Sequence, residues 1–343
     1  MPLPAAVRAC LIALLFSPIV IAQEPPADTP PLRRWFEIDF AQLGMRYRVI
    51  ETSAGDVTSN QVQHREQFRA RFKFDPRARY AVHAGLFTGS AFTSGWNNTG
   101  VGTGEPIANL RLKQLFAAAT PVDGVQGQVG GLYVTRGEST EITTYDEDAY
   151  IMGERVQVTR PKQLWFDEIA FTNAQLAYVT TPGVEHRWDG FGDPNYRQFL
   201  VRKKIGDVGA SADFTTLDGA RTIRAALAVA FAPVSVRLEG YRRVRVAPAG
   251  GFAITLERPL TEWLRASGGY ATIDRNYGSL NGDRFERGRR IFATTTITFT
   301  RWLNLSLFAT RAVAIDFPLP IRTRFDAVLT YNLLDSLRRT GVF

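Results

Sequence analysis

The sequence predicts an all-β protein, a transmembrane antiparallel up-and-down β-barrel. From Trp35 onward, segments of roughly ten residues alternate apolar and polar side chains and are separated by turn residues. Residues 67–74 place an apolar side chain at every second position, and residues 221–231 and 325–333 repeat the pattern. In a lipid layer, a sheet of such strands must close into a barrel, because an open sheet would leave the backbone groups of its edge strands without hydrogen bonds. The expected solution is therefore a barrel with an apolar outside and a polar inside.

Residues 1–22 are predicted to be a cleaved secretory signal. Arg8 precedes the apolar run 10–22, which ends on small or branched side chains before Gln23. A membrane-spanning helix needs about 20 apolar residues, whereas this run is shorter and is interrupted by Ser17-Pro18. The expected location is a bacterial outer membrane, reached by export.

The mature chain is expected to lack cysteine, because Cys10 is the only one and lies inside the signal. This excludes a disulfide scaffold, a thiolate zinc site and cysteine catalysis. Residues 23–34 are expected to be a proline-rich periplasmic leader, which is too short to be a plug domain.

The composition is compatible with a barrel. Hydrophobic residues make up 45% of the chain and the mean hydropathy is −0.12, values close to those of soluble proteins, because only half of each barrel strand faces lipid. A periplasmic β-sandwich or solenoid is the soluble alternative. It is disfavoured by the lack of a fixed-period repeat and by the many arginines within the polar faces.

The spacing of turns predicts sixteen strands. Short turns mark the periplasmic side, and longer polar loops mark the outer side. The seven short turns are expected at 75–78, 120–124, 160–162, 205–207, 232–233, 258–261 and 300–301, and the eight loops at 51–60, 89–106, 136–149, 180–196, 215–219, 247–251, 274–287 and 315–321. If 150–159 were a loop and 199–214 one strand, the number would fall to fourteen. The barrel would occupy 35–334, and 335–343 would be a tail or the end of the last strand.

The polar faces of these strands are rich in basic residues. The chain has 41 Lys+Arg and 33 Asp+Glu, a net charge of +8, and loss of Arg8 with the signal leaves +7. With the apolar faces toward lipid, the predicted pore-lining basic residues are Arg46, Arg48, Arg69, Arg71, Lys73, Arg111, Lys113, Arg202, Lys204, Arg224, Arg237, Arg243 and Arg245. Cations along a pore favour anions over cations. Alternatively, many of these arginines are solvated wall residues paired with the lumenal Glu37, Glu239 and Asp326.

The signal, the sixteen alternating strands, the unequal turns and the terminal Phe343 together resemble the general porins of Gram-negative outer membranes. The pattern departs from theirs near the end, where Asp335, Arg339 and Gly341 occupy positions expected to be apolar. The resemblance implies passive diffusion of small hydrophilic or anionic solutes. It also implies outer-membrane lipids and lipopolysaccharide as partners, with a homotrimer as a possible assembly.

The third outer loop, 136–149, is the most acidic stretch of the chain. In general porins this loop folds into the barrel and sets acidic groups opposite arginines. By that resemblance, Asp146, Glu147 and Asp148 are the acidic residues of a constriction, although the Pro-Glu-Phe core of the general-porin loop is absent. Two alternatives are a solvated acidic loop and a carboxylate site for calcium or a lipopolysaccharide-bridging cation.

Catalytic motifs are poor. His83 lies on the polar face of the third strand, where it could act as a base in a lipase- or protease-type barrel hydrolase, but no serine or aspartate pattern accompanies it. We therefore expect a non-enzymatic channel without cofactor, metal or nucleic acid, with mild anion preference. A barrel hydrolase and a structural or adhesion barrel are the alternatives.

Overall fold

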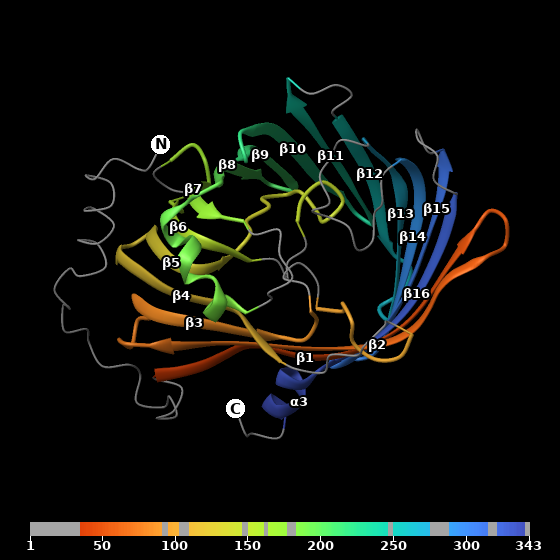
Figure 1. Ribbon diagram of the computed structural model, residues 1–343, viewed down its shortest axis with the longest axis horizontal. Coiled ribbons are helices and arrows are strands. Elements are labelled where there is room, and N and C mark those ends of the chain that lie inside the picture. The colour runs from red at the N-terminus through yellow and green to blue at the C-terminus, as the bar shows by residue number, and fades with distance from the viewer. Residues whose placement is uncertain are drawn as a thin grey trace.

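The computed structural model describes residues 35–90, 95–102, 110–145, 150–160, 164–176, 183–245, 250–274, 288–314 and 321–339. Sixteen strands form one ring around a central space (Figure 1). In chain order they are β1 Phe36–Thr52, β2 Val57–Lys73, β3 Tyr80–Phe87, β4 Arg111–Val122, β5 Val125–Tyr133, β6 Tyr150–Val158, β7 Glu168–Gln175, β8 Tyr196–Ile205, β9 Val208–Leu217, β10 Ala220–Phe231, β11 Val234–Val244, β12 Gly250–Pro259, β13 Leu264–Ile273, β14 Gly288–Thr300, β15 Leu303–Ala314 and β16 Arg322–Asn332.

The sheet is closed and antiparallel. Each strand pairs with the next along the chain, and β1 closes the ring by pairing with β16, with Arg48 opposite Asp326. Sixteen strands confirm the sequence-based number. The fourteen-strand alternative is wrong, because Tyr150–Val158 is a strand and a two-residue turn separates β8 from β9.

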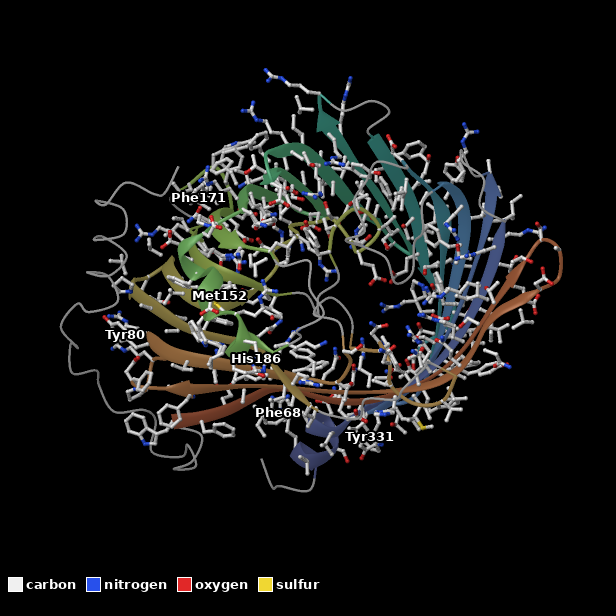
Figure 2. The ribbon with its side chains drawn as sticks, in the orientation of Figure 1. Phe68, Tyr80, Met152, Phe171, His186 and Tyr331 are labelled. Carbon is white, nitrogen blue, oxygen red and sulfur yellow. The ribbon has the colours of Figure 1, made fainter. Side chains whose placement is uncertain are left out.

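Alternate residues face the outside and the inside of the barrel, as the period of two predicted. On β10, Ile223 and Leu227 are exposed, whereas Thr222 and Arg224, on either side of Ile223, are buried. Phe171 shows the same outward direction on β7, where it lies at the outer edge of the ring (Figure 2). The exposed apolar side chains are therefore on the outside, and the buried polar side chains are on the inside.

Two connections differ from the expected outer loops. Residues 51–60 and 215–219 were expected to be loops, but strand pairing continues up to the turns 53–56 and 218–219. Asp218 and Gly219 both have positive φ, 48° and 80°. This is the backbone of the tight Asp-Gly hairpin turn that matches the twist of two paired strands.

The last strand ends at Asn332, where helix α3, Leu333–Arg339, begins. Leu334 packs against Ile38 and Ala41, which lie where β1 extends past the end of β16. The helix therefore covers the start of β1 from outside, and the predicted closing residue Phe343 lies outside the described residues. In the described part of the chain, no helix is long and apolar enough to cross a membrane.

Candidate functional site: the inner wall of the barrel

Most of the predicted basic residues point into the barrel. Strand register and alternation place on the inner face Arg46, Arg48, Arg69, Arg71, Lys73, Arg111, Arg202, Lys204, Arg224, Arg237 and Arg243. Lys113 is fully buried at an irregularity between β3 and β4. The interpretation of Arg245 as a wall residue of a strand is wrong, because β11 ends at Val244 and Arg245 follows it, exposed, with φ 67°.

Among the inward arginines that the sequence pattern did not assign, Arg155, Arg290 and Arg324 are buried. Arg324 could have been found, since it lies two residues before Asp326 on the same face of its strand. Arg290 follows Arg289, and two consecutive arginines conceal which one faces inward. Arg155 is only 1% exposed and donates to Thr172 and Gln128 on the two neighbouring strands, β7 and β5.

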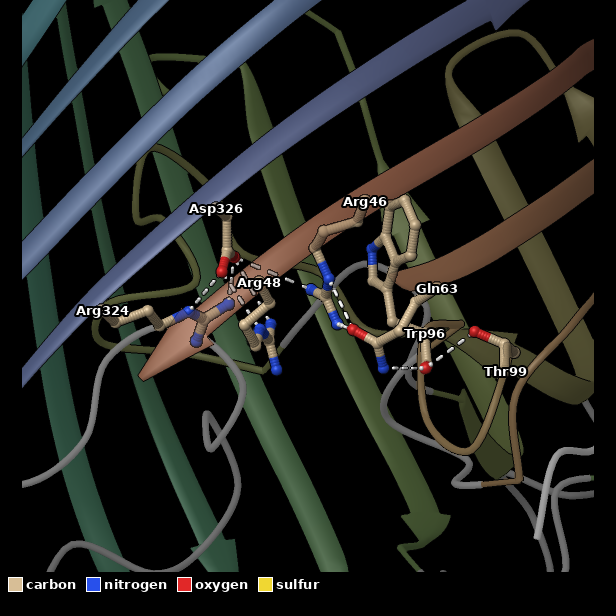
Figure 3. A network of polar contacts seen from close by, with 7 residues as sticks. All are labelled: Arg46, Arg48, Gln63, Trp96, Thr99, Arg324 and Asp326. Carbon is tan, nitrogen blue, oxygen red and sulfur yellow. Dashed lines mark hydrogen bonds and ion pairs between the residues drawn. The ribbon is translucent and has the colours of Figure 1, made fainter. Parts of the chain in front are cut away.

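A group of three arginines surrounds one carboxylate where the barrel closes (Figure 3). Arg48 Nε donates to Asp326 Oδ1 at 3.1 Å, and Arg324 Nε donates to the same oxygen at 3.0 Å. Arg46 Nη1 lies 3.9 Å from Asp326 Oδ2 and donates through Nε to Gln63 at 2.9 Å. Asp326 is fully buried. Since the side chains come from β1, β2 and β16, the carboxylate joins the two ends of the barrel sheet.

Residues 95–102 of the second outer loop lie against this same wall. Trp96 lies 4.5 Å from the guanidinium of Arg46 and 4.7 Å from that of Arg65, and its carbonyl accepts from Gln63 Nε2 at 2.8 Å. The ring rests above Gly44, where an added Cβ would meet the indole at 3.0 Å. Glycine at this position thus lets an aromatic ring lie against the strand, between two cations.

The described part of the third outer loop lies against the opposite wall. Glu239 on β11 accepts hydrogen bonds from the backbone N–H of Thr140 at 2.8 Å and from the hydroxyls of Thr140 and Thr143, each at 2.5 Å. Arg224 on β10 donates through Nε to the carbonyl oxygen of Thr143 at 2.9 Å. In Figure 1 this segment, residues 134–145, lies within the ring of strands.

Two further residues of the segment 134–145, Glu138 and Thr135, bind the inner wall. Glu138 accepts from Arg202 Nε at 2.7 Å, and its backbone N–H donates to Ser211 at 2.8 Å. Gln198 and Thr135 exchange two hydrogen bonds, of 2.8 and 3.0 Å. The described part of the third outer loop therefore lies against the inner faces of β8 to β11. Asp146, Glu147 and Asp148 lie outside the described residues, so their role stays a prediction.

Acidic and basic side chains also pair near the start of β1. Glu37 lies 2.9 Å from Arg71 and 3.3 Å from Lys73, and Asp39 lies 3.3 Å from Arg71. These pairs match the expectation that part of the wall arginines have acidic partners.

The histidine considered as a catalytic base has an apolar neighbour. The His83 ring is stacked on Phe116 with centroids 4.6 Å apart, and its Nδ1 lies 4.0 Å from Asp39. A ring held flat against an aromatic side chain is typical of a packed wall histidine.

Comparison with known protein families and with curated protein sequences finds no match for this chain. Solved structures do match. Salmonella typhi OmpF, in a complex with daunomycin, aligns with a TM-score of 0.58 and 11% identity, covering 86% of this chain and 97% of that chain. A variant of the Rhodobacter blastica porin aligns with a TM-score of 0.56 and 11% identity, covering 86% of this chain and 100% of that chain. The protein thus has the porin fold, as its sequence pattern predicted.

Proposed function

We propose that this protein is an outer-membrane channel through which small hydrophilic solutes diffuse passively, with a mild preference for anions. The observation that carries the proposal is a closed barrel that is apolar outside and polar and basic inside. An apolar outer surface suits contact with lipid, and a polar lumen suits water and solutes.

The charge of the inner wall supports the preference for anions. On the inward faces of the described strands, basic residues outnumber the acidic ones, which are Glu37, Asp39, Glu168, Asp213, Glu239, Glu257 and Asp326. Fixed cations along a narrow aqueous path raise the local concentration of anions and oppose the entry of cations. The acidic partners reduce this effect, and we therefore propose a mild selectivity.

The two loop segments on the inner wall support a limit on solute size. Residues 95–102 cover part of β1 and β2, and residues 134–145 cover part of β8 to β11. They lie on different parts of the wall and both reduce the space that the strands enclose. Small solutes are therefore the class that we propose for passage.

The same proposal includes export through the signal 1–22 and a periplasmic leader at 23–34. It also includes contact with outer-membrane lipid and lipopolysaccharide, and assembly as a homotrimer. The resemblance to general porins supports them. Non-enzymatic action is the corresponding proposal for the chemistry, since His83 is packed against Phe116.

Conductance in planar bilayers of neutral lipid tests the channel, and the reversal potential in a salt gradient tests the selectivity. Changing Arg69, Arg71, Arg111 and Arg243 together to glutamate should move the reversal potential toward that of a cation-selective channel. A matched control changes four outward-facing, exposed arginines to glutamate, namely Arg221, Arg242, Arg289 and Arg311. Equal shifts in both variants, or no ion-conducting pore at all, would contradict the proposal.

The acidic end of the third outer loop gives a second test. If Asp146, Glu147 and Asp148 reach the ion path, replacing them with the corresponding amides should strengthen the preference for anions with a small change in conductance. Deleting residues 140–148 should raise conductance more, because it also removes a steric barrier. If these carboxylates instead stand in bulk water, more than about a Debye length, 8 to 10 Å, from the ion path, replacing them with amides should leave both quantities as they were. The deletion should then still raise conductance, because it also removes residues 140–145 from the inner wall.

A further inference from the structure

The inner wall has a recess of about 210 Å³ near the short turns, at the end of the barrel opposite the outer loops. It lies between inward-facing residues of β8 to β12 and the loop residue Glu138. The turns 206–207 and 232–233 are close to it along the chain. Pockets that enclose drug-sized ligands measure about 300 to 1,000 Å³, so this recess suits a smaller occupant.

In the part of the chain that the structure describes, some of the charged side chains around the recess have a partner of opposite charge, and others do not. Glu138 is bound to Arg202 at 2.7 Å, and Glu257 is bound to Arg265 at 3.1 Å. Lys204 and Arg237 also line the recess, and neither has an acidic partner within 4.0 Å among the described residues. Asp207, the remaining acidic residue of the lining, is exposed in its turn.

Arg237 gives a more specific indication. Its Nε is buried and has no hydrogen-bond acceptor in the described part of the chain. A buried guanidinium N–H without an acceptor costs free energy, and a bound anion would remove that cost.

Hydroxyl groups complete the set of donors. Thr255 is the direct partner of Arg237 across β11 and β12, and Ser235 lies two residues from Arg237 on the same face. Opposite side chains on paired strands have Cβ atoms about 5 Å apart. Lys204 is held in place by Asp167, whose carboxylate accepts the Lys204 backbone N–H at 2.6 Å.

We infer that the recess binds a small oxyanion of the phosphate class, through Arg237 and Lys204 with hydrogen bonds from Ser235 and Thr255. A phosphate offers more acceptor oxygens than a chloride or a carboxylate, which suits a guanidinium, an ammonium and two hydroxyls. Resting on the proposed channel function, this inference adds a binding step for such anions at the short-turn end of the path. In a channel, bound phosphate would compete with chloride for passage.

Equilibrium binding of radiolabelled inorganic phosphate to the purified full barrel in detergent tests the inference without requiring conduction. The unmodified protein should bind phosphate saturably at one site, and an excess of acetate should compete poorly. Arg237→Gln should weaken binding about tenfold, as expected for loss of one charge-assisted interaction, and Arg237→Lys should restore part of it. Heat-dependent mobility on a gel establishes that each variant is folded.

Arg243→Gln is the matched control. It removes the same charge from the same face of β11, about 20 Å along the strand from Arg237, and phosphate binding should remain. Lack of saturable binding to the unmodified barrel, or equal losses in Arg237→Gln and Arg243→Gln, would overturn the inference. Binding at the recess without any measurable conductance would instead contradict the proposed channel function and leave the recess in place.

Discussion

Two buried carboxylates on different parts of the inner wall bind different kinds of donor. Asp326 on β16 is surrounded by the guanidinium groups of Arg46, Arg48 and Arg324, all of which belong to the wall itself. Glu239 on β11 accepts one backbone N–H and two hydroxyls, all from the third outer loop. The first carboxylate joins strand to strand, and the second joins loop to strand.

The difference shows how one kind of side chain serves two purposes. At Asp326, charged donors lie around a buried acid, and each group depends on the others for compensation of its charge. At Glu239, the donors are neutral and belong to a segment that would be hydrated if it were released. Loss of Asp326 should therefore affect the stability of the barrel, whereas loss of Glu239 should affect the position of a loop.

Asp326→Asn should have the largest effect. It leaves three buried arginines without their shared carboxylate, and breaking a buried charge pair costs about 3–5 kcal/mol. The measurement is urea unfolding in lipid vesicles, and anion preference should rise as well. Asp39→Asn is the control, because it makes the same change at a partly exposed pair with Arg71. Similar losses of stability in both variants would mean that the burial of Asp326 does not increase the cost of losing its charge.

Glu239→Ala should have an intermediate effect, concentrated on the loop. Hydrogen bonds to a charged group contribute about 1.5–3 kcal/mol each and are not additive. We therefore expect the free-energy difference between the bound and the released loop segment to shift by about 3 kcal/mol toward the released state. Trypsin should then cleave after Arg136, and conductance should rise. Glu257→Ala is the control, since Glu257 is an inner-wall carboxylate paired with Arg265. Unchanged cleavage and conductance in Glu239→Ala would show that other contacts fix the segment.

Trp96→Leu should have the smallest effect. It keeps an apolar side chain above Gly44 and removes two cation–π contacts, which together contribute about 1–2 kcal/mol. We expect slightly lower stability, measured in the same urea experiment. Trp165→Leu is the control, because Trp165 is 69% exposed. A loss as large as that of Asp326→Asn would show that the second outer loop, as well as Asp326, holds the arginine group together.

Part of this wall could be predicted from the sequence alone. Period-two alternation assigned Arg46, Arg48 and Arg224 to the inner face, because that pattern depends only on neighbouring residues. It also identified Glu239 and Asp326 as inner-wall acids. Which arginine meets which acid could not be predicted, since strand pairing brings Arg48 to Asp326 across 278 positions of the chain.

The sequence by itself determined the closed barrel, its sixteen strands and the basic character of its inner face, because alternation and turn residues are local properties. Tertiary structure alone decided that the described parts of two outer loops lie against the inner wall. It also decided that Trp96 lies between two arginines and that the donors of Arg237, Lys204, Ser235 and Thr255 share one recess. The reason is physical: these contacts join residues from different strands and loops, and closure of the ring brings them together.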